Sequence, residues 1–171
     1  MNIDTRYNFH KLLSINMRHQ ARNLTTIIPK EWLLILVNDG SFTETLTYLT
    51  GKKISIEIVK QHSLKKICTT REIWLQNNKN VKLAFAKSFL PLSKVIELYN
   101  NKPIGQSLIE HKTDIYKDIH EIYYGYCQYL ENRFDCKGPL WGRKYTIYYN
   151  ETRLVTLQEI FAPKIINFLK Q

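Results

Sequence analysis

The chain has 171 residues, 44% of them hydrophobic and 23% charged, with 6 Gly and 5 Pro. This length suits one compact domain with a single core, and the low Gly and Pro content excludes collagen-like and low-complexity chains. Twenty-five Lys and Arg against 15 Asp and Glu give a formal net charge of +10. The lysines are dispersed as pairs and singletons rather than gathered in a stripe, so we do not expect the protein to bind nucleic acid.

No segment of the sequence predicts membrane insertion or export. The longest purely apolar run, Trp32–Val37, is far shorter than the ~20 residues that span a bilayer. The first six residues have neither the apolar stretch of a secretory signal nor the Arg- and Ser-rich composition of a transit peptide. We therefore expect no membrane span and a protein that works in the compartment that makes it.

The three cysteines, Cys68, Cys127 and Cys136, are odd in number and have no Cys-X-X-Cys spacing. This pattern predicts neither a disulfide framework nor a four-ligand zinc site. The five histidines show no ligand spacing either. We expect a reducing compartment and no bound metal.

The start of the chain predicts a lead-in followed by the core of one domain. Residues 1 to about 30 form a polar lead-in, and we place the core at residues 31–163. The apolar run Trp32–Val37 predicts a buried strand, and Asn38-Asp39-Gly40 predicts the turn after it. No Pro-, Gly- or Ser-rich linker divides the sequence, which indicates a single domain over residues 1–171.

A short helix is predicted directly after that turn. Ser41 and Glu44 have the spacing of a capping box, in which the Ser side chain accepts a hydrogen bond from the backbone at the helix start. The helix runs over about Phe42–Leu49. Gly51 is its natural C-terminal end, because Gly readily adopts the left-handed conformation that ends many helices.

Antiparallel strands dominate the rest of the chain. Alternation of apolar and polar residues, with turn residues between the segments, predicts strands at Ile54–Lys60, Arg71–Gln76, Val81–Phe89, Trp141–Tyr149 and Thr152–Phe161. The second and third form one hairpin, and the last two form another. Pro91–Ile109 predicts two short helical pieces, and for Ile115–Ile122 the periodicity leaves helix and strand open. The whole pattern indicates an α+β fold rather than a parallel α/β sheet.

Four charged side chains fall on the apolar faces of these predicted strands. They are Arg71, Lys87, Arg143 and Glu159. Their charges sum to +2, and a buried charge without a partner is costly, so the set predicts an internal pocket for a small dianion. An alternative for Lys87 and Arg143 is that they reach the edge of the sheet, or that a bulge shifts a face.

Six short segments follow one another along residues 32–163. They are Trp32-Leu33-Leu34 leading to Asp39-Gly40-Ser41-Phe42-Thr43; Arg71-Glu72-Ile73-Trp74-Leu75; Ala86-Lys87-Ser88-Phe89-Leu90-Pro91-Leu92-Ser93; Lys102-Pro103-Ile104-Gly105; Leu140-Trp141-Gly142-Arg143; and Leu157-Gln158-Glu159-Ile160-Phe161-Ala162-Pro163. In this order they resemble the chorismate lyase family, and within it the short branch of cyanobacteria and red-algal plastids.

The resemblance implies a cofactor-free enzyme that removes pyruvate from chorismate and leaves 4-hydroxybenzoate, a ring precursor of ubiquinone or plastoquinone. It implies a single antiparallel sheet of about six strands, surrounded by short helices, with a closed internal cavity. The substrate, chorismate, is a small dianion, and we expect the protein to act as a monomer. The location implied is a plastid or a bacterial-type cytoplasm.

The ligand contacts of the family carry over to Arg71, Phe42, Ile104, Lys87, Arg143 and Glu159. Arg71 would grip the ring carboxylate, and Glu159 would lie near the oxygen substituent of the ring, which makes these two the expected catalytic pair. Two roles stay open for Glu159: it assists proton transfer at the ether oxygen or the ring, or it only accepts a hydrogen bond from the product hydroxyl.

The chain departs from the family in two places. Lys87 stands where the family is expected to have Arg, and residues 124–138 look like an insertion. Either Lys87 or Arg143 would receive the second carboxylate. The main alternative function is a small-molecule sensor without catalysis, because the sheet implied by this resemblance is similar to that of the effector-binding domains of GntR-type repressors.

Overall fold

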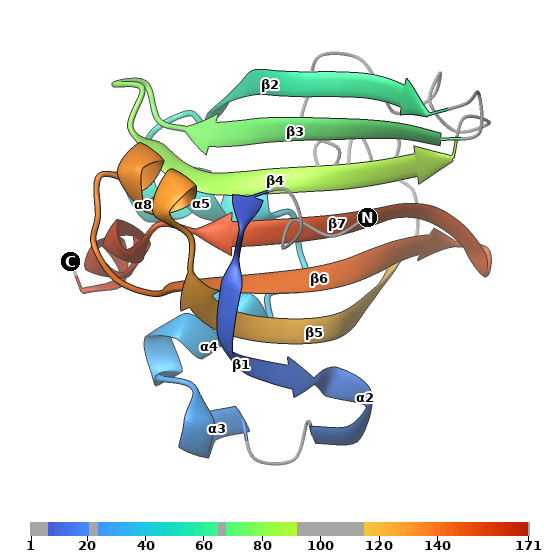
Figure 1. The fold of residues 1–171 in the computed structure, drawn as a ribbon, viewed down its shortest axis with the longest axis horizontal. Helices are drawn as coiled ribbons and strands as arrows, with labels where there is room; N and C mark the ends of the chain where they lie inside the picture. Colours follow the sequence, from blue (N-terminus) through green and yellow to red (C-terminus); the bar gives the residue numbers. More distant parts are fainter. Residues whose placement is uncertain (1–6, 21–23, 65–67, 92–114, 171) are drawn as a thin grey trace.

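The structure, a computed structural model, describes residues 7–20, 24–64, 68–91 and 115–170. One antiparallel sheet of seven strands, in the order β1-β5-β6-β7-β4-β3-β2, forms its centre (Figure 1). The strands are β1 (His10–Asn16), β2 (Ser55–Leu64), β3 (Cys68–Gln76), β4 (Lys82–Pro91), β5 (Tyr116–Tyr126), β6 (Leu140–Tyr149) and β7 (Thr152–Phe161). The helices are α2 (Met17–Gln20), α3 (Leu24–Ile27), α4 (Lys30–Leu36), α5 (Phe42–Thr50), α8 (Gln128–Phe134) and the 3-10 helix η3 (Pro163–Leu169). The expected α+β class with a single antiparallel sheet is confirmed.

The sheet has seven strands rather than about six because part of the expected lead-in is a strand. β1 pairs with β5 at the edge of the sheet, and of its seven residues only Ile15 is buried. An edge strand with one buried residue carries little of the apolar alternation that identifies a strand in a sequence.

The segment expected as a buried strand at Trp32–Val37 is instead helix α4. Its N-cap is Pro29, a residue that fits a helix start because its φ is already helical and its missing N–H needs no partner there. Ile35 and Leu36 are buried while Leu34 is 66% exposed, which is the pattern of a helix with one buried side. A short apolar run predicts burial but does not separate a strand from a helix.

The helix expected after the turn is confirmed as α5. The Ser41 side chain accepts a hydrogen bond from the backbone N–H of Glu44, with 3.5 Å between nitrogen and oxygen. At the other end Gly51 has a φ of 61°, the left-handed conformation expected of it.

The two expected hairpins are confirmed, and the undecided segment is a strand. β3 pairs with β4, and β6 pairs with β7. In β5 the register shifts between Ile119 and Glu121, where a bulge adds a residue. Because of that extra residue, Ile119 and Ile122 lie on the same face although they are three positions apart, which imitates helical spacing.

The two short helices expected within Pro91–Ile109 lie outside the described residues, apart from Pro91, which ends β4. Among the helices of the described ranges, none has the length and apolar composition that a membrane crossing requires.

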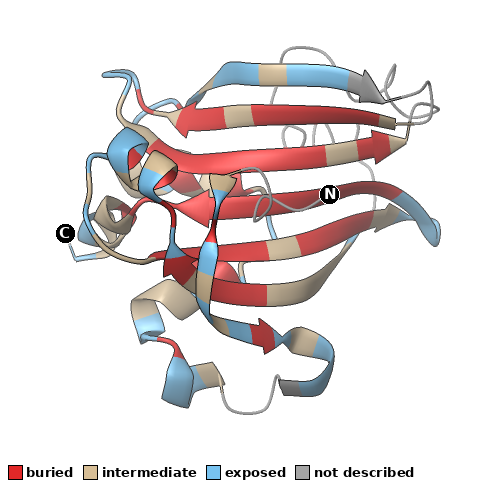
Figure 2. Ribbon diagram, in the orientation of Figure 1, coloured by how far each residue is buried: buried red, intermediate tan, exposed pale blue. Residues whose placement is uncertain are grey.

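Both faces of the sheet are covered, so its central strands are buried on both sides (Figure 2). On one face Phe42 of α5 packs on Phe161, with ring centroids 4.8 Å apart. On the other, Phe134 of α8 packs on Trp74 at 5.3 Å. We call these the α5 face and the α8 face. The expected insertion at residues 124–138 therefore comprises the end of β5 and the helix that covers the α8 face.

Candidate functional site

A cavity of about 240 Å³ lies on the α5 face. Its floor crosses two rows of paired residues: one is Arg71, Ser88, Leu157 and Tyr145, and the other is Ile73, Ala86 and Glu159. β4 contributes only the small side chains of Ala86 and Ser88 to these rows, which leaves space between its larger neighbours. The volume is below the ~300–1,000 Å³ of pockets for drug-sized ligands, so it suits a single substituted ring.

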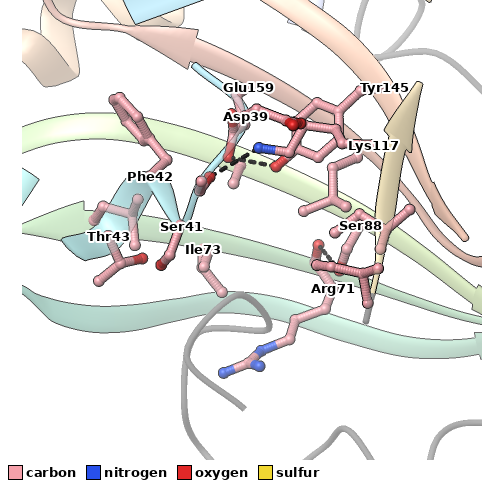
Figure 3. Close-up of a pocket in the computed structure, with 16 residues that line it drawn as sticks. Asp39, Ser41, Phe42, Thr43, Arg71, Ile73, Ser88, Lys117, Tyr145 and Glu159 are labelled. Atoms are coloured by element: carbon pink, nitrogen blue, oxygen red, sulfur yellow. Dashed lines mark hydrogen bonds between the residues drawn. The ribbon is translucent and has the colours of Figure 1, made fainter. Parts of the chain in front are cut away.

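Polar groups stand at two ends of this cavity (Figure 3). The side chains of Lys117, Tyr145 and Glu159 gather at one end, and the guanidinium of Arg71 lies at the other. Between them the lining is mainly apolar, with residues such as Ile73, Leu75, Ile115, Ile147 and Leu157 beside the hydroxyl of Ser88. Arg71 and Glu159 stand two strands apart, ~10 Å at the usual strand spacing of ~4.8 Å. Both are buried, with 2% and 4% of their surface exposed.

The Glu159 carboxylate accepts hydrogen bonds on both oxygens. Arg143 Nε donates to Oε2 at 2.8 Å, and the Tyr145 hydroxyl donates to Oε1 at 3.0 Å. Burial raises the pKa of Tyr145 well above its ordinary value, and the neighbouring carboxylate adds to this. Tyr145 is therefore a neutral hydrogen-bond donor throughout the physiological pH range.

Arg143 is fully buried and does not line the cavity. Besides Glu159, its Nη1 donates to the backbone carbonyls of Ile35, Leu36 and Asn38 at 3.0, 3.2 and 3.0 Å. These carbonyls lie at the end of α4 and in the turn after it, where helix carbonyls have no partner within the helix. Arg143 thus holds this turn against the sheet and fixes the direction of Glu159. This structural role differs from the expectation that Arg143 receives a substrate carboxylate.

Lys117 is a cavity residue that the sequence analysis missed. Its Nζ donates to the backbone carbonyls of Gly40 at 2.8 Å and Asn38 at 3.1 Å, and it lies 5.0 Å from the centre of the Tyr145 ring. Burial, with the nearby Arg143 guanidinium, lowers the pKa of Lys117 to about 8. The signal was present in the sequence, because Lys117 alternates with Ile115 and Ile119, but it could be used only once the segment was known to be a strand.

The first turn of α5 forms another wall of the cavity. Ser41, Phe42 and Thr43 line it, so Phe42, one of the expected ligand contacts, is at the cavity. The N-terminal end of a helix carries a partial positive charge, which favours a bound anion beside it. Ile104, another expected contact, lies outside the described residues.

Lys87 lies on the α8 face, away from the cavity. It is paired in register with Glu72 and is 1% exposed, and its Nζ is 3.1 Å from Glu72 Oε1. Arg71 pairs instead with Ser88. The hairpin joins odd-numbered residues of β3 to even-numbered residues of β4, so Arg71 and Lys87 necessarily point to opposite faces. We grouped Lys87 with Arg71 because the face of each strand was assigned separately. Since both faces of β4 are buried, its apolar residues do not show which face Lys87 occupies.

The Glu72 and Lys87 pair is part of a polar group inside the α8 face. The Tyr7 hydroxyl donates to Glu72 Oε2 at 2.6 Å. This arrangement compensates the two buried charges, as buried ion pairs require. Within the described ranges, no three His, Cys, Asp or Glu side chains come together in a way that would hold a metal ion.

The family model described as chorismate pyruvate-lyase Rv2949c-like matches residues 36–169. The chain is also similar to three proteins described as uncharacterized protein ycf21. The protein of Antithamnion sp. is 41% identical, and the aligned region covers 99% of both chains. That of Pyropia yezoensis is 35% identical over 84% of this chain and 87% of its own. That of Cyanophora paradoxa is 31% identical over 82% of this chain and 81% of its own.

Two solved structures have a similar fold. The effector domain of PhnF from Mycobacterium smegmatis has a TM-score of 0.55 at 11% identity, over 73% of this chain and 90% of that domain. The ligand-binding domain of a GntR-family transcriptional regulator from Bordetella bronchiseptica has a TM-score of 0.53 at 11% identity, over 66% of this chain and 84% of that domain. At this identity the likeness shows the fold alone, and it agrees with the fold expected from the sequence.

Proposed function

This chain belongs to the chorismate pyruvate-lyase Rv2949c-like family, and we propose that it is itself a chorismate lyase, which converts chorismate to 4-hydroxybenzoate and pyruvate. The observation that carries the proposal is the cavity on the α5 face, with the Arg71 guanidinium at one end and the Glu159 carboxylate at the other. Its size suits one six-membered ring. Its two ends suit the carboxylate and the oxygen substituents that lie on opposite sides of such a ring.

Arg71 holds the ring carboxylate in this proposal. A guanidinium offers a planar pair of N–H donors that matches a carboxylate, and a charged hydrogen bond of this kind contributes about 1.5–3 kcal/mol. The larger effect is positional, because a substrate fixed at one end presents its departing group in a single orientation. The ring lies over Ala86 and Ser88, and the apolar walls exclude water.

The reaction needs no co-reactant. The ether bond between the ring and the enolpyruvyl group breaks, and its electrons leave with the three-carbon fragment. The neighbouring ring carbon, which carries the hydroxyl, loses its proton, and the ring becomes aromatic. The methylene carbon of the fragment gains one proton, which gives pyruvate. The protein orients the substrate and stabilises the negative charge that develops on the departing group.

Glu159 lies at the oxygen end of the proposed substrate. Two donors, Arg143 and Tyr145, fix both of its oxygens, so the carboxylate cannot rotate away from the cavity. We propose that it accepts a hydrogen bond from the ring hydroxyl and assists the transfer of the ring proton. The Tyr145 hydroxyl stays protonated and holds Oε1 of this carboxylate.

The test is to incubate the purified protein with chorismate and to measure pyruvate and 4-hydroxybenzoate together. The proposal predicts equal amounts of both at a rate above that of chorismate alone, and an Arg71→Gln variant that loses most of the activity. An Arg18→Gln variant is the matched control, because Arg18 is 67% exposed and lies on α2, outside the cavity lining. Absence of both products with the wild-type protein would contradict the proposal.

A second candidate function is binding without turnover. It is favoured by the likeness of the fold to effector and ligand-binding domains of transcriptional regulators. In that case 4-hydroxybenzoate or chorismate would bind in calorimetry and Arg71→Gln would weaken the binding, but no pyruvate would form. The two candidates share the site and differ only in this product.

We also propose that the protein works in a plastid and supplies the ring of a quinone. The similar ycf21 proteins come from red algae and from Cyanophora paradoxa, which supports this location. Fractionation of the source cells with an antibody against the protein tests it, since the proposal expects the protein with the plastid fraction.

A further inference from the structure

We propose that Lys117 is a second anion-binding group of the cavity, which holds the carboxylate of the departing three-carbon group and makes the site selective for dicarboxylates over monocarboxylates. The inference rests on the proposed function for the identity of the substrate. The position of Lys117 carries the rest: it lines the cavity at the end away from Arg71.

The charge of Lys117 lacks a close carboxylate partner within the described residues. Its Nζ donates to two neutral groups, the carbonyls of Asn38 and Gly40, and within the described residues no carboxylate lies close enough to form an ion pair with it. Two carboxylates, Glu159 and Asp39, act on its charge from farther away, and Glu159 is already paired with Arg143 at 2.8 Å. A partly buried ammonium in this situation favours an anionic ligand beside it.

The geometry leaves Lys117 able to take that ligand. An ammonium group has three N–H donors, and two of them are used by the Asn38 and Gly40 carbonyls. One donor therefore remains for a carboxylate oxygen without loss of the existing bonds. The two carbonyls also fix the ammonium in place, so little side-chain freedom is lost when the ligand binds.

This assignment gives the cavity two cations for two carboxylates. Arg71 holds the carboxylate of the ring, and Lys117 holds the one on the group that leaves. After the reaction the aromatic product keeps only the carboxylate at Arg71. Lys117 thus distinguishes substrate from product, and loss of its contact favours product release.

The test uses two stable aromatic acids that differ by one carboxylate, 3-(carboxymethoxy)benzoate and 3-methoxybenzoate. The wild-type protein is expected to bind the diacid about tenfold more tightly or better, the value of one charged hydrogen bond. Lys117→Met is expected to remove this preference while it leaves the affinity for the monoacid unchanged, and Lys117→Arg is expected to keep the preference. Equal affinity of the wild-type protein for both acids, or an equal loss for both in Lys117→Met, would overturn the inference.

Lys82→Met is the matched control. Lys82 is also partly buried, and its Nζ lies 5.1 Å from the centre of an aromatic ring, that of Trp74, but it does not line the cavity. This variant is expected to keep the preference for the diacid. A purely structural role of Lys117 would lower the thermal stability and both affinities together, whereas the proposed role separates the two acids.

Acidity gives an independent readout. Burial and Arg143 lower the pKa of Lys117, while Glu159 and Asp39 raise it, and the resulting pKa is about 8. The preference for the diacid is expected to fall between pH 7 and pH 9 in the wild-type protein and to persist in Lys117→Arg, because a guanidinium stays charged. Since these measurements need no turnover, a protein that shows the preference but releases no pyruvate refutes the lyase proposal alone, and a lyase without the preference refutes this inference alone.

Discussion

Arg143 and Glu159 lie directly opposite each other in the register of β6 and β7, with 2.8 Å between Nε and Oε2, and neither side chain is more than 5% exposed. The same guanidinium holds the turn that follows α4. The pair therefore joins the floor of the cavity to the segment that forms its wall, and it links the stability of the fold to the shape of the site.

Removal of Arg143 is expected to destabilise the whole protein. Arg143→Met leaves the Glu159 carboxylate buried without its cation and removes one donor from three backbone carbonyls, and losing one member of a buried pair costs about 3–5 kcal/mol. Chemical denaturation measures this loss. The double variant Arg143→Met with Glu159→Leu is expected to recover part of it, since no unpaired charge remains. A single variant as stable as the wild type would contradict the structural role.

Replacement of Glu159 by Gln separates the two roles of this residue. We expect turnover of chorismate to fall about 100-fold or more, the scale of general acid–base assistance, while binding of 4-hydroxybenzoate changes much less. Steady-state kinetics and calorimetry measure the two effects. Tyr145→Phe is the companion variant, because it removes one hydrogen bond to the Glu159 carboxylate and keeps the negative charge of Glu159. Unchanged turnover in Glu159→Gln would leave Glu159 with a binding role only.

Lys87 is expected to affect stability and not the site. Lys87→Met removes the ammonium that compensates the buried Glu72 carboxylate, so a loss of about 3–5 kcal/mol is expected. At a temperature where the variant is folded, its KM for chorismate is expected to equal that of the wild type. A large rise in KM with unchanged stability would show that Lys87 reaches the substrate, against its position on the α8 face.

Gly142 is expected to tolerate no side chain. A Cβ at this position would lie 2.5 Å from Tyr123 Cε2 and 2.7 Å from the backbone oxygen of Glu159. Gly142→Ala therefore pushes β6 away from the strand that carries Glu159, and a loss of about 1–3 kcal/mol and weaker ligand binding are expected. For stability, Gly40→Ala is the control, because its Cβ would meet nothing closer than 4.0 Å. Equal melting temperatures of the two variants would contradict this prediction.

The stability contribution of Lys117 is expected to depend on pH in a defined direction. Its pKa is about 8 in the folded protein, against an ordinary value of 10.5 in the unfolded chain. Between pH 8 and pH 10.5 the unfolded chain therefore binds more protons than the folded protein. Stability therefore rises with pH in this window and is independent of this group well below pH 8. The difference in unfolding free energy between the wild type and Lys117→Met, measured from pH 7 to pH 10, is expected to shift in favour of the wild type. A shift in the opposite direction would contradict the assigned pKa.

Local patterns in the sequence were sufficient for much of the fold. The capping spacing at Ser41 and the alternation in the two hairpins depend on neighbours in the chain, and the structure confirms them. α4 and β5 needed information from outside the segment. The buried side of α4 exists only against the sheet, and the bulge in β5 is visible only against its partner strand.

The site was predicted in part for the same reason. Arg71, Phe42 and Glu159 line one cavity, and each was identified from its own strand or from the resemblance. The different positions of Lys87 and Arg143 follow from pairing between strands, which fixes the face of one and the partner of the other. Lys117 needed the strand assignment of β5 before its alternation with isoleucines had a meaning.

A crystal structure of the protein with 4-hydroxybenzoate is the decisive experiment for the proposed roles of Arg71 and Glu159. We expect one ring in the cavity on the α5 face, with its carboxylate within hydrogen-bond distance of Arg71 and its hydroxyl toward Glu159. A ring bound elsewhere, or one whose carboxylate does not meet Arg71, would contradict it.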